Sequence, residues 1–180
     1  MANLLQIHEP GQTPLPHAQT VAVGIDLGTT HSVVAIASDG VAEAIHDAQG
    51  RAIIPSMVQY AKERVIVGHE ARRAYGAGEV GVIASIKRLM GKAAHEVAEV
   101  AGQLAYEIDS LHEGLVRVKA AERSLTPIEV SADILRHLKA MASEALGREV
   151  SRVVITVPAY FDDAARAATK DAARLAGLEV

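Results

Sequence analysis

Five residues that follow an apolar segment, Asp26-Leu27-Gly28-Thr29-Thr30, have the composition of a phosphate-binding turn. A tight turn with glycine and two hydroxyl side chains brings several backbone N–H groups toward one point, and the absent Cβ lets an oxyanion come close. A carboxylate at the end of the preceding strand can hold hydrated Mg²⁺, because Mg²⁺ keeps several of its waters in proteins. Taken alone, these residues fit a plain hairpin turn slightly better, since Asp, Gly and Thr are common in turns.

A lysine that would complete such a site is absent from the turn itself. The sequence has no GxxxxGK[ST] motif, and no GxGxxG follows the strand. Lys87 stands beside Arg88 in the otherwise apolar segment 82–90, which we expect to be helical. A lysine in a cleft acts as a point charge for phosphate, whereas a lysine–arginine pair on a solvated helix face has no such role. From these residues alone both interpretations stay open.

The segment Val157-Pro158-Ala159-Tyr160-Phe161 carries the only phenylalanine of the chain at the end of an apolar strand. Ligands of open α/β sheets gather at the carboxyl ends of strands. Ordinary packing of a strand–helix turn explains the segment equally well, and both explanations can hold together. The eight histidines are scattered without HExxH spacing, which predicts no metal centre.

The elements that position these residues follow from hydrophobic periodicity. Apolar segments at 21–25, 32–37 and 41–46, separated by turn residues, predict an antiparallel three-strand meander. Strand-like patterns return at 57–60, 64–67, 104–108 and 115–118, and helical ones at 70–75, 82–90 and, more weakly, 93–100.

The second half of the chain predicts a helix, a strand and another helix. Thr126-Pro127-Ile128-Glu129 is a capping box that begins a helix ending at Gly147. The β-branched run 153–157 predicts a strand buried on both faces, and Asp162 or Asp163 caps a helix to Leu175. The sequence thus predicts an α/β fold with a mixed sheet, antiparallel hairpins and a strand–helix–strand unit cut short at Val180. We expect a flexible tail at 1–20, a core subdomain at 21–54 and 127–180, and an inserted smaller subdomain at 55–126.

Composition excludes several classes of function. The 180 residues are 49% hydrophobic with a net charge of −4, no cysteine and only 3% aromatic side chains. Absence of cysteine removes disulfides and thiolate ligands, and mixed charge disfavours nucleic acid or a basic membrane arm as partner. Because no apolar run is long enough to span a bilayer and the start does not fit a secretory signal, we expect a cytoplasmic protein.

The motifs together resemble one family, the seventy-kilodalton heat-shock chaperones (Hsp70), over residues 21–180. The matching segments, in family order, are Gly24 to Ser32, Ile54-Pro55-Ser56, Gly68 to Ala74, Lys87-Arg88-Leu89-Met90-Gly91, and Val154 to Val180. The resemblance implies one lobe of an actin-like (ribonuclease H-like) ATPase. Actin-like filament proteins and sugar or acetate kinases share the superfold, but the Val-Pro-Ala-Tyr-Phe block favours the chaperones.

The resemblance also implies roles for individual residues. Asp26 would lie near a water-coordinated Mg²⁺, and Gly28, Thr29 and Thr30 would cradle the β- and γ-phosphates of ATP or ADP. Lys87 would hold the γ-phosphate and the attacking water, so that Lys87 and Asp26 are the expected catalytic residues. A relay that reports nucleotide state would consist of Pro158 and Arg166, surrounded by Tyr160, Asp163 and Lys170. His31 stands at a variable family position and receives no role.

A narrower resemblance concerns the HscA branch of the family, which serves iron–sulfur cluster assembly. It rests on Met1 to Gly11, on Arg88 to Gly91, and on Asp162-Asp163, where DnaK-type members usually have Asn-Asp. It implies a J-type co-chaperone and an iron–sulfur scaffold protein as partners. Because the family's second phosphate loop and adenosine segment would lie beyond Val180, we expect these 180 residues alone to bind nucleotide weakly and not to turn it over.

Overall fold

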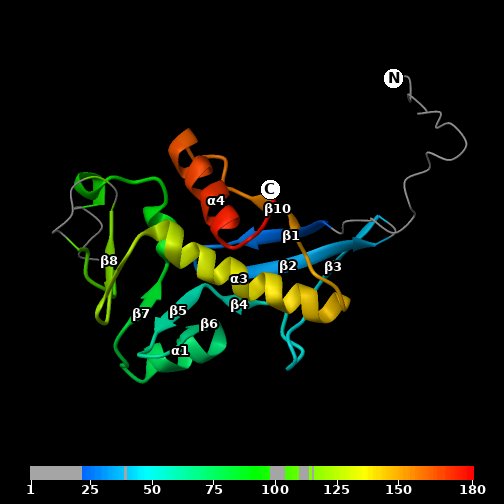
Figure 1. The fold of residues 1–180 in the computed structure, drawn as a ribbon, viewed down its shortest axis with the longest axis horizontal. Coiled ribbons are helices and arrows are strands. Elements are labelled where there is room, and N and C mark those ends of the chain that lie inside the picture. Colours follow the sequence, from blue (N-terminus) through cyan, green and yellow to red (C-terminus); the bar gives the residue numbers. More distant parts are fainter. Residues whose placement is uncertain (1–21, 39, 98–103, 110–113, 115) are drawn as a thin grey trace, which may run out of the picture.

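The computed structural model describes residues 22–38, 40–97, 104–109, 114 and 116–180 (Figure 1). The predicted tail at 1–20 and the Met1 to Gly11 segment lie outside the described residues. In the part of the chain that is described, no helix is long and apolar enough to cross a membrane.

The larger sheet contains β1 (Ala22–Leu27), β2 (His31–Ser38), β3 (Val41–Ala44), β4 (Ile54–Pro55) and β10 (Arg152–Thr156). Its strand order is β10-β1-β2-β3, and β4 pairs with β2. The β1–β10 pair is parallel, while β1–β2, β2–β3 and β2–β4 are antiparallel. The predicted meander and mixed sheet are therefore confirmed, and the register places Thr156 beside Asp26.

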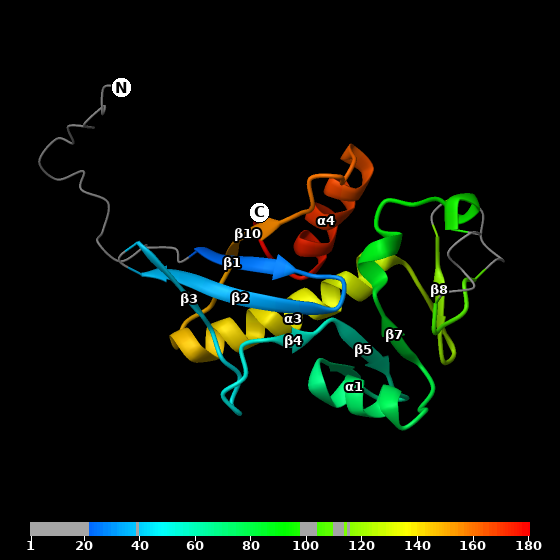
Figure 2. The ribbon, with the colours of Figure 1, turned by 180° about the vertical axis from the view of Figure 1, so that it is seen from behind.

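Helix α3 (Pro127–Leu146) lies across one face of this sheet, and α4 (Asp163–Leu175) packs beside α3 (Figures 1 and 2). Along β1, the side chains of Val23, Ile25 and Leu27 face the helices and are buried, while the alternate residues are exposed. The prediction that the last strand is buried on both faces is wrong, because Val154 in β10 is 65% exposed. A β-branched run fits a pleated strand whether one or both faces are covered.

The insertion between β4 and α3 forms two smaller sheets. One has the order β6-β5-β7, from β5 (Met57–Tyr60), β6 (Val65–Val67) and β7 (Val82–Ala84), and the other pairs β8 (Val118–Ala120) with β9 (Arg123–Leu125). The helices here are α1 (His69–Gly76) and two 3₁₀ turns, η1 (Ile86–Leu89) and η2 (Ala94–Val97). The division at 54/55 and 126/127 into two subdomains stays a prediction.

Two predictions in this insertion are wrong. The expected helix at 82–90 is a strand, β7, followed by the 3₁₀ turn η1, because Ser85 between them takes a left-handed conformation with φ of 56°. Among the described residues, the expected strand at 104–108 contributes one bridge, from Ile108 to Val118. Short apolar runs do not distinguish a strand from a helical turn.

The predicted caps of α3 are confirmed. Thr126 Oγ1 accepts from the Glu129 amide at 3.2 Å, Glu129 Oε2 accepts from the Thr126 amide at 2.7 Å, and Gly147 ends the helix with φ of 63°. These bonds satisfy backbone groups that a helix end otherwise leaves without partners. The start and end of the longest helix are thus set by local sequence.

The insertion is joined to α3 by a partly buried hydrogen bond, from Tyr60 Oη to Asp133 Oδ2 at 2.8 Å. Burial raises the pKa of Tyr60, and the Asp133 carboxylate raises it further. We expect Tyr60→Phe to lower the free energy of unfolding by about 1–2 kcal/mol, since the bond has a charged acceptor. Urea unfolding of the complete gene product measures the loss, and Tyr75→Phe at an exposed tyrosine is the control. Equal stability of both variants would contradict the expectation.

Candidate functional site

The turn after β1 is held from behind by two serines. The Gly28 amide donates to Ser32 Oγ at 3.2 Å, and Ser32 Oγ lies 2.8 Å from Ser56 Oγ. The Ser56 amide donates to the carbonyl oxygen of Thr30 at 2.8 Å. A Cβ at position 28 would collide with the carbonyl oxygen of His31, so this close turn requires glycine. Ile54-Pro55-Ser56 is part of the family resemblance, but no sequence motif predicts that Ser32 and Ser56 hold the turn in place.

The front of the turn has unused donors. The Thr29 and Thr30 amides donate to no acceptor within the described residues, whereas the Gly28 amide is engaged by Ser32. Two adjacent free N–H groups at a turn are suited to oxyanions. Of the three residues expected to cradle phosphates, Thr29 and Thr30 therefore have free amides, and Gly28 shapes the turn.

Asp26 lies where β1 ends, next to the end of the parallel strand β10. Its Oδ1 accepts from Thr156 Oγ1 at 2.9 Å, and the carboxylate is otherwise exposed. Thr156 was not predicted as a site residue, and its position in the register opposite Asp26 identifies it only in the structure. The pair orients one carboxylate at the carboxyl edge of the sheet.

The sequence left open whether Lys87 lies on a solvated face, and in the structure its side chain is mostly buried. It lies on η1 and is 9% exposed, while its neighbour Arg88 is exposed to solvent. Its Nζ lies 5.4 Å from the centre of the Phe161 ring and has no hydrogen-bond acceptor within the described residues. Burial lowers the pKa of Lys87, and the Asp26 carboxylate opposes that shift. A bound anion would stabilise the Lys87 ammonium group, because a charge partly removed from water is costly without a partner.

Phe161 joins this lysine to the predicted relay pair. The Phe161 amide donates to the Pro158 carbonyl at 3.1 Å, and the Phe161 carbonyl accepts from Arg166 Nε at 3.0 Å. Tyr160 is 81% exposed and packs edge-on against the Phe161 ring, with centroids 5.6 Å apart. Phe161 was predicted as part of a motif but without a role, and the structure makes it the contact between Pro158, Arg166 and Lys87.

The other two predicted relay residues do not join this cluster. Asp163 and Lys170 are exposed on α4. Asp162 caps that helix, since its Oδ1 accepts from the Ala165 amide at 2.8 Å. A carboxylate in place of the family's usual amide therefore makes the same cap and adds a favourable charge at the helix N-terminus.

The residues present fit Mg²⁺ held through water and phosphate. Within the described ranges, no group of three or more His, Asp or Glu side chains could hold a metal ion directly. One carboxylate beside free phosphate-binding donors is nonetheless the usual arrangement for Mg²⁺ in nucleotide sites. The cluster thus suits a metal that arrives with its nucleotide.

Comparison with known proteins identifies the family of the chain. The family model described as Hsp70 protein matches residues 22–180. The chain belongs to the Hsp70 family. The Hsp70 ATPase domain is an actin-like fold, so the predicted fold class is confirmed, and neither the filament nor the kinase alternative is favoured.

The similar Hsp70 proteins include members of the HscA branch. A "Chaperone protein HscA homolog" of Pseudomonas aeruginosa (strain UCBPP-PA14) is 52% identical over 177 residues, which are 98% of this chain and 29% of that protein. The homolog of Tolumonas auensis is 49% identical over 98% of this chain and 28% of that protein. "Chaperone protein HscA" of Proteus mirabilis is 47% identical over 99% of this chain and 29% of that protein. The chain spans less than a third of the length of these relatives.

Proposed function

We propose that this chain supplies one wall of the ATP and Mg²⁺ site of an Hsp70 chaperone. The observation that carries the proposal is the convergence of a mostly buried lysine, a carboxylate and two free amides. Asp26 and the Thr29–Thr30 turn come from one segment of the chain and Lys87 from another, and Asp26 acts electrostatically on Lys87. These are the groups that a triphosphate with its metal ion needs.

Each group has a distinct task in this proposal. The Thr29 and Thr30 amides bind phosphate oxygens, and Asp26, oriented by Thr156, accepts hydrogen bonds from metal-bound water. Lys87 holds the γ-phosphate and the attacking water, and stabilises charge that shifts during phosphoryl transfer. Mg²⁺ held near Asp26 through its waters would neutralise phosphate charge during transfer.

The cluster around Phe161 supports a reporting role for Pro158 and Arg166. Because the Phe161 ring lies over Lys87 while its backbone binds both relay residues, a shift of Lys87 toward phosphate displaces the same turn. We place Tyr160 beside this turn, and Asp163 and Lys170 on the exposed side of α4 as contacts for other parts of the protein. ATP hydrolysis would in this way be coupled to binding and release of a client.

The client proposed is an iron–sulfur scaffold protein, with a J-type co-chaperone that stimulates hydrolysis, in the cytoplasm. Support comes from the similarity to HscA proteins over nearly the whole chain. With no cysteine, this chain offers no thiolate ligand, so the cluster itself would stay with the client.

Asp26→Asn tests the metal part of the proposal. We expect the complete gene product to bind ATP with Mg²⁺ at least about tenfold more weakly after the change, because one charge-assisted contact to metal-bound water is lost. Affinity for ATP without Mg²⁺ stays unchanged. Isothermal titration with and without Mg²⁺ measures both, and Glu43→Gln, on the exposed strand β3, is the control. An equal gain from Mg²⁺ in Asp26→Asn and in the wild type would contradict the assignment.

A further inference from the structure

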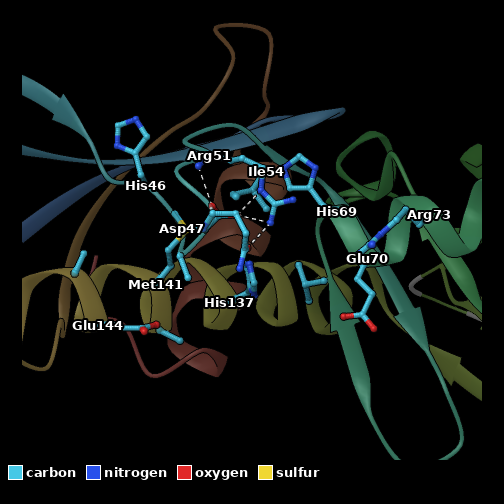
Figure 3. Close-up of a pocket in the computed structure, with 15 residues that line it drawn as sticks. His46, Asp47, Arg51, Ile54, His69, Glu70, Arg73, His137, Met141 and Glu144 are labelled. Atoms are coloured by element: carbon cyan, nitrogen blue, oxygen red, sulfur yellow. Dashed lines mark hydrogen bonds and ion pairs between the residues drawn. The ribbon is translucent and has the colours of Figure 1, made fainter.

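A second hollow lies between the segment 45–53, the start of α1 and the middle of α3 (Figure 3). Its volume is about 840 Å³, and its lining is more polar than apolar. Ile54 in β4 lines this hollow, whereas the Ser56 amide, two residues later, donates to the Thr30 carbonyl of the phosphate-binding turn. None of the residues assigned above to the nucleotide site lines it.

Histidines and arginines from three elements face this hollow. The set is His46 and Arg51 from the segment after β3, His69 and Arg73 from α1, and His137 from α3. Three carboxylates also line it, but two of them already have partners: Asp47 pairs with Arg51 at 2.7 Å and Glu70 with Arg64 at 3.0 Å. The bond from Arg51 lowers the pKa of Asp47 to about 2, so this pair is neutral as a whole.

The two glutamates lie away from His69 and His137. In Figure 3, His137 and His69 lie near the Asp47–Arg51 pair at the centre, while Glu70, beside Arg73, and Glu144 lie toward the two ends. Glu144 is seven residues beyond His137 on α3, which corresponds to about 10 Å along the helix axis. The centre of the hollow therefore lacks an unpaired carboxylate.

His137 and His69 lie close enough to influence each other. A Cβ at Gly68, the residue before His69, would lie 3.8 Å from His137 Nε2. His69 Nε2 lies 3.0 Å from the Ile53 carbonyl oxygen, while His137 makes no hydrogen bond within the described residues. Burial lowers the pKa of His137, the nearby His69 lowers it further, and Asp47 acts in the opposite direction.

We propose that this hollow is a binding site for a small oxyanion, a phosphate-type or carboxylate group, held between His69 and His137. Two neighbouring imidazoles repel each other when protonated, and an anion between them removes the repulsion. Binding is therefore accompanied by uptake of a proton and is tighter at acidic pH. A metal ion is disfavoured, since the described residues contain no group of three ligands with suitable geometry.

Sulfate is the first probe, because its charge stays constant across the range in which histidines titrate. The complete gene product is titrated with sodium sulfate at about pH 6 and about pH 8, with the imidazole resonances of His69 and His137 followed by NMR. We expect both resonances to shift, and the affinity to fall up to about tenfold for each pH unit above the histidine pKa. A parallel series with succinate distinguishes carboxylate from phosphate-type ligands.

Four variants locate the binding. His137→Gln removes the titrating group, and His69→Gln repeats the test in case the first change disturbs α3; both should lower sulfate affinity at pH 6 at least about tenfold. His95→Gln on η2 lies outside the hollow and should bind as the wild type. Lys87→Ala should leave the sulfate-induced shifts of His69 and His137 unchanged, because Lys87 does not line this hollow. No shift of His69 or His137 at any sulfate concentration below about 50 mM, or an unchanged response in both His69→Gln and His137→Gln, would overturn the proposal.

Discussion

Replacing Lys87 by alanine is expected to lower kcat for ATP hydrolysis by the complete gene product about 10²–10³-fold. Lys87 is mostly buried and feels the charge of Asp26, and its ammonium group has no hydrogen-bond acceptor in the described residues, so it is free to stabilise transferring phosphate. Loss of one preorganised charge that acts mainly on the transition state has an effect of this size. Single-turnover hydrolysis measures the chemical step directly.

Arg88→Ala is the matched control for this change. Arg88 is the next residue on the same turn and is exposed. We expect it to retain kcat within about twofold, since exposed substitutions away from a site have small effects. Similar rates for the Lys87 and Arg88 variants would contradict the catalytic assignment, and ATP affinity measured alongside separates a binding defect from a chemical one.

Gly91→Ala is expected to lower the free energy of unfolding by about 3 kcal/mol or more, the largest single-site loss of stability that we predict. Gly91 has φ of +74°, and an added Cβ would lie 2.5 Å from the Ala165 backbone nitrogen and 2.8 Å from Ala165 Cα. Because these are backbone atoms in the first turn of α4, no side chain can move aside. Urea unfolding of the complete gene product measures the loss.

Two other glycines separate the causes. Gly78 has the same φ of +74° but no atom within 4 Å of an added Cβ, so Gly78→Ala isolates the cost of the backbone conformation, about 1–2 kcal/mol. Gly76 in α1 has neither a positive φ nor a close neighbour, so Gly76→Ala should be neutral or slightly stabilising. If Gly91→Ala lowered the free energy of unfolding no more than Gly78→Ala does, the close approach of Gly91 to α4 would not add to the loss of stability.

The sequence predicted the parts of the fold that local chemistry determines. The α3 caps, the turn at Gly28 and the Asp162 cap all depend on residues within a few positions of one another. The η1 turn could not be predicted, since its form depends on Ser85 taking a left-handed conformation that local propensity disfavours. The exposure of Val154 depends on which face of the sheet the helices cover, and the pattern of residues in β10 does not indicate that face.

The same distinction applies to the candidate site. Asp26, Thr29, Thr30 and Lys87 came from motifs, but the residues that support them came only from the structure. Thr156 reaches Asp26 across 130 positions of sequence, and Ser56 reaches Ser32 across 24. Such contacts depend on strand register, which a single sequence does not show. Phe161 is intermediate, because its motif was visible while its contact with Lys87 was not.

The hydrogen bonds behind the phosphate-binding turn have a consequence for the entropy of binding. Ser32 and Ser56 hold the Gly28 amide and the Thr30 carbonyl in place without any ligand. The conformational freedom of this turn is therefore already lost when the chain folds, and an incoming phosphate does not have to order it. Affinity at this wall should then depend on electrostatic attraction and desolvation, with little contribution from loop closure.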